Sequence, residues 1–518
     1  MHGSGRGNKD QAVIDDPYRP DCPVCGGFME SSGKDWHCKK CGKYLRKNPK
    51  RIPKDFYVRW GFDTDKAEKH ARRCEKKKRL IVTSAQNNTP VDKAFWLALK
   101  QCARYYNCEI AVIPSHYKNV TLFDKEPKSW VDELSSYLVH TDIEFGNVLI
   151  RSDVKINATT LWPLSGKQAH GGNHWVVFGH PQIACEPVAT PSDMLPKRLY
   201  TTGSCTLPNY SISDSGEKAK FHHCAGALII EKQKDFCFVR QINADERGHF
   251  YDLDVKFTQN GHTKGHRALS LTTGDEHVKF NIVSEETYTK RGSIVKTLKP
   301  KYIVRHDVLD GYAGSHHHEK DPMLQYVKHT QGDNDYAAEL DEVVDFINNT
   351  TPEDSITLIV PSNHHDHLKK FLDKADANND HLNAHFILDM QKAMREAADK
   401  GENYDPFYLY LKDRLKCKFE FLDRNTPYLL GDVDHSQHGD VGTNGSRGGA
   451  RAMARTTFKM TIGHSHGARI CQGVFQTGVS TGRLEYERGL SDHSNTHVLL
   501  YPNGKRTLID IIDGKWKA

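Results

Sequence analysis

The chain has 518 residues, 37% of them hydrophobic, which is enough for two or three domains with ordinary packed cores. No stretch reaches the ~20 apolar residues of a membrane span, and the polar start MHGSGRGNKDQ lacks a signal-peptide apolar region, so we expect a cytoplasmic protein without membrane contact. The net charge of +6 is unevenly distributed, because residues 1–80 hold 21 Lys and Arg against 11 Asp and Glu and the remaining residues carry a net charge of −4. A basic region of this kind indicates a polyanionic partner, with a solvated basic face as the alternative.

Four cysteines near the N-terminus have the spacing of a zinc site. They form a C-x2-C pair, twelve intervening residues and a second C-x2-C pair. Two such turns can close a tetrahedral four-thiolate site, which leaves no open position for catalysis. The segment resembles the zinc-ribbon superfamily over about 25 residues. We expect one structural zinc ion with the ligands Cys22, Cys25, Cys38 and Cys41.

A basic extension follows the cysteines and completes a first region at residues 1–78. Its Lys and Arg residues alternate with aromatic residues, a texture that suits phosphate contact combined with base stacking. The alternative is a basic, solvated linker and helix. The candidate DNA contacts in this extension are Lys47, Arg51 and Arg59.

The middle of the chain, residues 79–262, is expected to be a mixed α/β domain. An apolar strand at 79–86, an amphipathic helix at 89–107 and a second strand at 108–117 predict a βαβ unit. From about residue 146 the pattern changes to short alternating strands separated by Gly and Pro turns. We expect this domain to position substrate or to mediate oligomerisation.

The second half of the chain concentrates the 30 histidines and places metal-ligating residue types after predicted strands. Four apolar runs, at 267–280, 301–312, 355–368 and 456–467, each end in Asp, Asn or His. The helical segment 335–349 between the second and third runs predicts a crossover with parallel strands. Side chains at the carboxyl ends of such strands converge in one crevice. Strand alternation would direct Asp275 and His277 of the first run to the same side, and likewise His464 and His466 of the fourth run.

These residues form five motifs in a fixed order: D-x-H at Asp275 and His277, D-x-x-D at Asp307 and Asp310, N-H at Asn363 and His364, a later His438, and H-x-H at His464 and His466. The order resembles the calcineurin-like metallophosphoesterase superfamily. The resemblance implies an α/β (α+β) protein in which residues 263–518 form a four-layer αββα metallophosphoesterase sandwich. The sequence departs from the pattern at His306 and Ser362, where the family usually has glycine, and at His365, where it has an acidic residue.

The resemblance also implies roles for these residues. Asp275, His277 and His466 would bind one divalent metal, Asn363, His438 and His464 would bind a second, and Asp307 would bridge them. Mn is expected, with Fe, Zn or Mg as alternatives. His364 would protonate the leaving oxygen, and Asp310 would orient its ring.

Other assignments stay open in the sequence. Asp432, Asp434 and His435 lie close to His438 and compete with it as ligands. Arg447 and Arg451 either contact phosphate or lie on the surface at a helix start. The remaining histidines of the runs at 316–318 and 364–367 are expected to be solvent-facing loop residues.

The expected function is hydrolysis of DNA by a dinuclear-metal phosphodiesterase, through in-line attack of a metal-bridging hydroxide. The basic N-terminal region favours DNA as the substrate, and the chain resembles the repair-nuclease branch and the bacteriophage-encoded DNases of the superfamily. A phage origin would place it in the host cytoplasm. One alternative is a nucleotide or phosphoprotein phosphatase, and a second is a DNA-binding regulator with an inactive phosphatase fold. Whether the protein forms a homo-oligomer stays open in the sequence.

Overall fold

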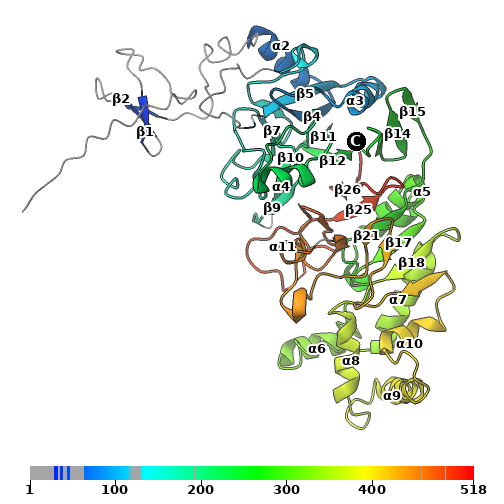
Figure 1. The fold of residues 1–518 in the computed structure, drawn as a ribbon. Coiled ribbons are helices and arrows are strands. Elements are labelled where there is room, and N and C mark those ends of the chain that lie inside the picture. Colours follow the sequence, from blue (N-terminus) through cyan, green and yellow to red (C-terminus); the bar gives the residue numbers. More distant parts are fainter. Residues whose placement is uncertain are drawn as a thin grey trace, which may run out of the picture.

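The structure, a computed structural model, describes residues 29–32, 35–38, 44–46, 64–115, 117, 130–191, 194–456, 458–484 and 486–518. Within these residues the chain is a mixed α/β protein, as predicted, with one ten-stranded sheet, one six-stranded sheet and three smaller sheets. No helix of the described part is long and apolar enough to cross a membrane. In Figure 1 the strands of the N-terminal half lie at one end of the molecule, and helices α6, α8, α9 and α10 lie at the other.

The cysteine-rich region contains a small antiparallel sheet of β1 (Met29–Ser32), β2 (Asp35–Cys38) and β3 (Tyr44–Arg46). Cys38 ends β2 and is buried. The zinc ribbon and its basic extension stay predictions, because the other residues assigned to them lie outside the described residues. These are Cys22, Cys25, Cys41, Lys47, Arg51 and Arg59.

The predicted βαβ unit is confirmed. Its helix α3 (Lys93–Tyr106) begins at Asp92, whose side chain accepts a hydrogen bond from the Phe95 amide, and ends at the left-handed Asn107. The apolar face of α3, including Trp96, packs against a four-stranded sheet in which β4 and β5 are parallel. The sheet order is β12-β11-β4-β5, and the strands are β4 (Arg79–Gln86), β5 (Glu109–Ser115), β11 (Gly226–Gln233) and β12 (Phe236–Asn243).

The ten-stranded sheet contains strands from both sides of the predicted boundary between residues 262 and 263. The join is made by β23 and β9, which pair at Ile470 and Cys185. The domain division stays a prediction, but the two regions share one sheet. In sheet order the strands are β20 (Leu429–Leu430), β21 (Val433–Asp434), β22 (Lys459–Ile462), β24 (Val474–Gln476), β23 (Arg469–Cys471), β9 (Cys185–Val188), β10 (Lys197–Thr201), β8 (Trp175–Phe178), β7 (Val148–Arg151) and β6 (Ile143–Phe145).

The six-stranded sheet carries three of the predicted ligand-bearing strands side by side. β16, β17, β18 and β19 are parallel, and α7 (Tyr336–Thr350) connects β17 to β18 as the predicted crossover. Leu340, Val343 and Ile347 of α7 are buried, as their spacing predicts. The strands are β19 (Phe419–Phe421), β18 (Ile356–Ile359), β17 (Tyr302–Arg305), β16 (Ser270–Thr272), β25 (Thr496–Leu500) and β26 (Arg506–Asp510).

The two large sheets pack against each other. Val304 of β17 and Leu358 of β18 share an apolar cluster with Leu430 of β20 and Val433 of β21. The opposite face of the six-stranded sheet is covered by helices, and the short α11 packs on the ten-stranded sheet. The covering helices are α7, α8 (His365–Lys374), α9 (Ala384–Asp399) and α10 (Pro406–Lys412), and α11 spans Ala450–Met453.

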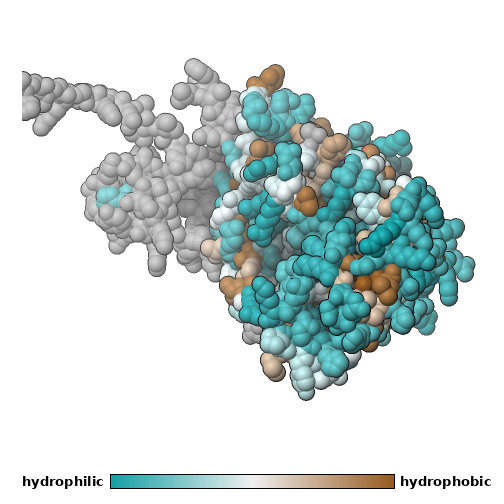
Figure 2. All heavy atoms as spheres, turned by 90° about the horizontal axis from the view of Figure 1, so that it is seen from below, coloured by the Kyte–Doolittle hydropathy of each residue, from teal (hydrophilic) through white to brown (hydrophobic). Residues whose placement is uncertain are grey.

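The remaining elements connect these layers. They are α2 (Thr64–Glu75), η1 (Asp132–Leu134), α4 (Asp214–His222), β13 (Phe250–Asp252), β14 (Val255–Thr258), β15 (Gly261–Thr263), η2 (Val278–Phe280), η3 (Glu285–Thr289), α5 (Ile294–Leu298), α6 (Pro322–Gln331) and η4 (Thr443–Gly445). Seen from the end that carries α6, α8 and α9, the surface is mostly hydrophilic with separate apolar patches (Figure 2).

Candidate metal centre

The predicted ligands lie in the loops that follow five strands, three in the six-stranded sheet and two in the ten-stranded sheet. They come after β16, β17 and β18 in the six-stranded sheet, and after β21 and β22 in the ten-stranded sheet for His438 and the H-x-H motif. The crevice is therefore built where the two sheets meet. The residues are Asp275, His277, Asp307, Asn363, His438, His464 and His466.

Strand alternation does not orient these side chains, and that part of the sequence interpretation is wrong. The strands end before the ligands, and the chain then turns through left-handed backbone conformations that only a few per cent of non-glycine residues adopt. Such conformations concentrate at functional sites, where surrounding structure holds them in place. The φ angles are +36° at His277, +42° at Asp307, +75° at His464 and +50° at His466.

Asp275, His277 and His466 form the first candidate ligand group. One ligand atom of each lies within 4.8 Å of the others, and all three side chains are buried. Nε2 of His466 is 3.7 Å from Oδ2 of Asp275, and Nε2 of His277 is 3.9 Å from Oδ2 of Asp307. The structure thus brings together the three residues that the resemblance assigns to one metal, with Asp307 beside them.

The second group also lies beside Asp307. Nε2 of His438 is 3.0 Å from Oδ2 of Asp307, and the ring centroids of His438 and His464 are 5.3 Å apart. Asn363 lines the same cavity as Asp307 and His464. Among the alternatives to His438, Asp432 forms an ion pair with Lys459 instead.

Several buried ligand atoms lack any hydrogen-bond partner in the described part of the chain. An unpaired buried polar atom costs about 1–3 kcal/mol, so a group of them in one place is unfavourable unless another species satisfies them. Carboxylate, amide and imidazole donors are those that divalent transition metals accept, so the residues fit a metal. The atoms are Oδ1 of Asp275, Nε2 of His277, Oδ1 of Asp307 and Oδ1 of Asn363.

The electrostatics of the group also favour a cation. Burial and the nearby Asp307 carboxylate raise the pKa of Asp275, and the His438 imidazole lowers it, with a net value of about 7. Burial raises the pKa of Asp307 as well, but the imidazoles of His438 and His364 outweigh it and hold that pKa well below its usual range. Burial lowers the pKa of His438, whereas Asp307 raises it to about 9 as the net result. Two carboxylates in one dry site repel each other, and a cation between them removes that cost.

Two carboxylates contact the Nδ1 atoms of the two imidazoles in the first group. Oδ2 of Asp310 is 2.8 Å from Nδ1 of His277, and Oε1 of Glu487 is 2.5 Å from Nδ1 of His466. These contacts leave Nε2 of each ring for a metal, the arrangement by which carboxylates fix and strengthen histidine ligands. Glu487 also holds His493, at 2.8 Å from Nδ1. Sequence reasoning missed Glu487, because it belongs to no motif and reaches His466 only through the fold.

The contact between Asp310 and His364 differs from the expected one. Nδ1 of His364 donates to the backbone carbonyl of Asp310 at 2.8 Å, while the Asp310 carboxylate is 3.8 Å away and serves His277. Burial lowers the pKa of His364, but the carboxylates of Asp307 and Asp310 outweigh it and the pKa is raised. The ring is therefore oriented by Asp310, but through the main chain.

The candidate centre opens into a cavity of about 550 Å³. Asp307, Asn363 and His364 line it, together with the exposed Arg488, a cation that sequence reasoning did not single out. Neither predicted phosphate-contact arginine is among its lining residues. Arg451 forms an ion pair with Glu186 at 2.7 Å, and Arg447 is exposed on a separate loop.

The departures from the family pattern have structural explanations. His306 is buried and its Nδ1 is 3.2 Å from Nδ1 of His438, so it fills space beside the second group. His365 and His367 are buried in α8 rather than solvent-facing, which corrects the expectation for both. Nε2 of His365 is 3.1 Å from the amide of Val308 and accepts its hydrogen bond.

Comparison with known proteins gives one clear relationship. No family model matches the chain, and no solved structure matches it. Protein A1 of Escherichia phage T5 is 31% identical over 465 residues, which cover 85% of this chain and 83% of that protein. The phage source of this relative agrees with the predicted phage character. At this identity and coverage, the chain belongs to the family of the phage T5 protein A1.

Proposed function

We propose that the protein is a metal-dependent DNase of the calcineurin-like metallophosphoesterase type. The observation that carries the proposal is the position of Asp307 beside members of both ligand groups, with Nε2 of His277 at 3.9 Å and Nε2 of His438 at 3.0 Å from its Oδ2. A carboxylate in this position suits a bridge between two ions.

Two divalent ions in such a site, Mn(II) by preference, supply positive charge for a phosphate and activate water for in-line attack. The chain itself supplies the remaining functions. Asp310 and Glu487 hold His277 and His466 in the tautomer that leaves Nε2 free. The left-handed turns fix the ligands before substrate arrives, so little reorganisation is needed during reaction.

His364 is the proposed general acid. It lines the cavity, its Nδ1 is anchored at 2.8 Å to the Asp310 carbonyl, and nearby carboxylates raise its pKa. A raised pKa favours the protonated ring, whose free nitrogen can donate a proton to the leaving oxygen.

DNA is the proposed substrate because of charge. The surplus of basic residues at 1–80, with a predicted structural zinc ribbon, suits a polyanion, and Arg488 adds an exposed cation at the cavity. Lys47, Arg51, Arg59, Arg447 and Arg451 are proposed as contacts to DNA outside the cavity. A nucleotide or phosphoprotein phosphatase is the second candidate, since the same centre suits any phosphate ester.

The test is incubation of the purified chain with labelled single- and double-stranded DNA, nucleotide monophosphates and phosphopeptides, with Mn(II), Mg(II), Zn(II) or EDTA. The proposal expects DNA cleavage with Mn(II), none with EDTA, and none by the Asp307→Ala variant. Hydrolysis of monoesters with intact DNA would favour the phosphatase. DNA binding without hydrolysis of any substrate would favour an inactive regulator.

A further inference from the structure

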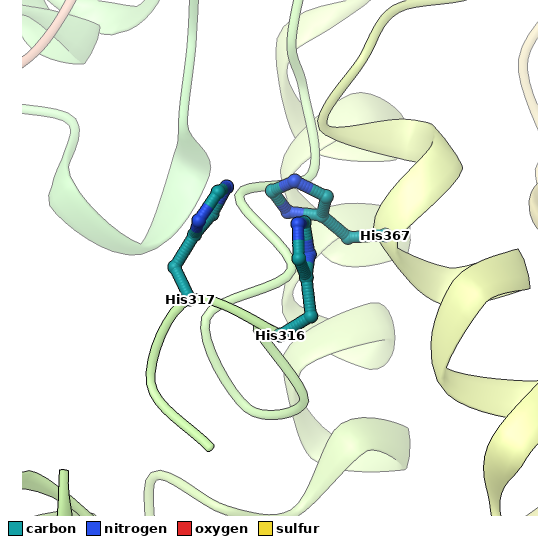
Figure 3. Close-up of side chains that lie close together, drawn as sticks. All are labelled: His316, His317 and His367. Atoms are coloured by element: carbon teal, nitrogen blue, oxygen red, sulfur yellow. The ribbon is translucent and has the colours of Figure 1, made fainter. Parts of the chain in front are cut away.

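A second cluster of imidazoles lies beside the candidate centre and belongs to neither ligand group. His316 and His317 come from the loop between β17 and α6, and His367 comes from the first turns of α8 (Figure 3). One ring nitrogen of each lies within 4.8 Å of the other two. The ring of His316 is the central one, with centroid distances of 3.9 Å to His317 and 5.1 Å to His367.

The cluster has ligand atoms to offer. Nδ1 of His316 and Nδ1 of His367 are buried and lack hydrogen-bond partners among the described residues, and the His367 side chain is only 6% exposed. Burial lowers the pKa of His367 to about 3, so that ring is neutral and keeps a lone pair for a metal, and burial also lowers the pKa of His316. His317 is exposed, which leaves one side of the cluster open to solvent.

We propose that His316, His317 and His367 form a third metal site, which binds a transition ion of the Zn(II) type. Three imidazoles with an open fourth position are an established zinc ligand set, and imidazole suits Zn(II), Ni(II) and Cu(II) better than Mg(II) or Ca(II). The absence of a carboxylate from the group distinguishes it from the candidate centre and disfavours Mn(II).

The site would connect the two segments that flank the candidate centre. His316 and His317 follow Asp307 and Asp310 in the same loop, while the amide of His367 donates to the carbonyl of His364 at 3.0 Å. The rings of His364 and His367 are 4.8 Å apart. An ion held by all three histidines would tie the loop after β17 to α8, and thereby brace the two segments against each other. The inference goes beyond the proposed function and does not depend on it.

The test uses the full-length chain at pH 7.5, with excess Mn(II) present to occupy the candidate centre. Zn(II) is titrated in competition with a chromophoric chelator, for the unmodified chain and for His317→Ala and the double variant His316→Ala/His317→Ala. His317 is exposed, so its removal leaves the packing intact. His318→Ala is the matched control, because its ring packs on Tyr312 at 5.2 Å and lies outside the group.

The unmodified chain and His318→Ala should bind one more Zn(II) per chain than the double variant. His317→Ala should bind that ion at least about tenfold more weakly, because removal of even a partner behind a ligand costs about 10- to 100-fold. Zn(II) should also raise the Tm of the unmodified chain more than that of the double variant. Equal Zn(II) binding by all four proteins, or an equal loss in His318→Ala, would overturn the site. DNA cleavage is not a readout, so failure of the nuclease proposal would leave this result interpretable.

Discussion

Glu487 shows how much of the candidate centre depends on single residues outside any motif. Its carboxylate holds Nδ1 of His466 at 2.5 Å and Nδ1 of His493 at 2.8 Å. Burial raises the pKa of Glu487, but the two imidazoles outweigh it and hold that pKa at about 2, so the group is ionised at any working pH. It therefore acts as a fixed negative partner for His466.

Glu487→Ala is expected to weaken Mn(II) binding by roughly 10- to 100-fold, the usual effect of removing the carboxylate behind a histidine ligand. Glu487→Gln should lose less, because its amide oxygen still accepts from His466. Calorimetric Mn(II) titration of both variants measures the effect. Glu353→Ala, an exposed glutamate, is the control. Unchanged affinity in Glu487→Ala would show that Glu487 does not support a metal ligand.

His364→Ala is expected to keep both metals and lose about 10²- to 10⁴-fold in kcat, the usual contribution of a general acid. The control is the exposed His381→Ala. Metal loss in His364→Ala would make His364 a ligand instead.

Asp310→Asn should behave differently from His364→Ala, because the Asp310 carboxylate contacts His277 while the Asp310 backbone carbonyl holds His364. It should reduce metal affinity rather than remove the acid.

At the scale of elements, the regular parts were predictable and the turns were not. Apolar runs bounded by turn residues identified β4, β5, β17 and β18, and the helical spacing of Leu340 and Ile347 identified α7. These signals are local. The left-handed turns that orient His464 and His466 are not, because they are imposed by the packing around them.

Gly463, at the end of β22, has a steric role that can be tested. A Cβ added there would lie 2.2 Å from Oδ1 of Asp275 and 3.1 Å from Cγ of His306. Gly463→Ala should therefore displace the Asp275 carboxylate and lower Mn(II) affinity, with the fold retained. Gly473→Ala is the matched control, since its nearest neighbour would be 3.6 Å away. If both alanine variants bind Mn(II) like the unmodified chain, the close packing of Gly463 against Asp275 is not required for the centre.

At the scale of the whole molecule, the ten-stranded sheet joins regions that composition had separated. The C-terminal strands also return to the N-terminal half, where the Gln241 side chain accepts a hydrogen bond from the Leu508 amide, and the C-terminus lies beside β11 and β14 in Figure 1. Long-range pairing of this kind leaves no periodic signal in the sequence. The middle region thus supplies part of the frame around the centre, and Ala189 reaches its cavity.

A buried ion network holds the N-terminal half of this frame. Oε2 of Glu231 is 2.7 Å from Nη1 of Arg240, and its Oε1 is 2.5 Å from Nε of Arg79. Arg240 also contacts Asp252 at 2.7 Å. Burial raises the pKa of Glu231, but Arg240 and Arg79 outweigh it and lower that pKa from 4.5 to about 2.

This shift predicts an acid dependence of stability. A carboxyl with a lowered folded-state pKa stabilises the protein above its unfolded pKa, and the contribution, roughly 3 kcal/mol, is lost as pH falls from about 4.5 to about 2. Glu231→Gln should lower the free energy of unfolding at pH 7 by a similar amount and reduce its change between pH 5 and pH 3. Urea unfolding at these pH values measures both. An unchanged pH dependence in Glu231→Gln would show that Glu231 does not cause the loss of stability in acid.

The most direct test of the central claim is a count of metal ions. Equilibrium dialysis with Mn(II), followed by elemental analysis, is carried out on the full-length chain and on Asp307→Ala. The account predicts two Mn(II) ions per chain in the unmodified protein and loss of tight binding of both in Asp307→Ala, because Asp307 lies beside members of both ligand groups. An unmodified chain that binds no Mn(II), or a variant that still binds two ions as tightly, would contradict it.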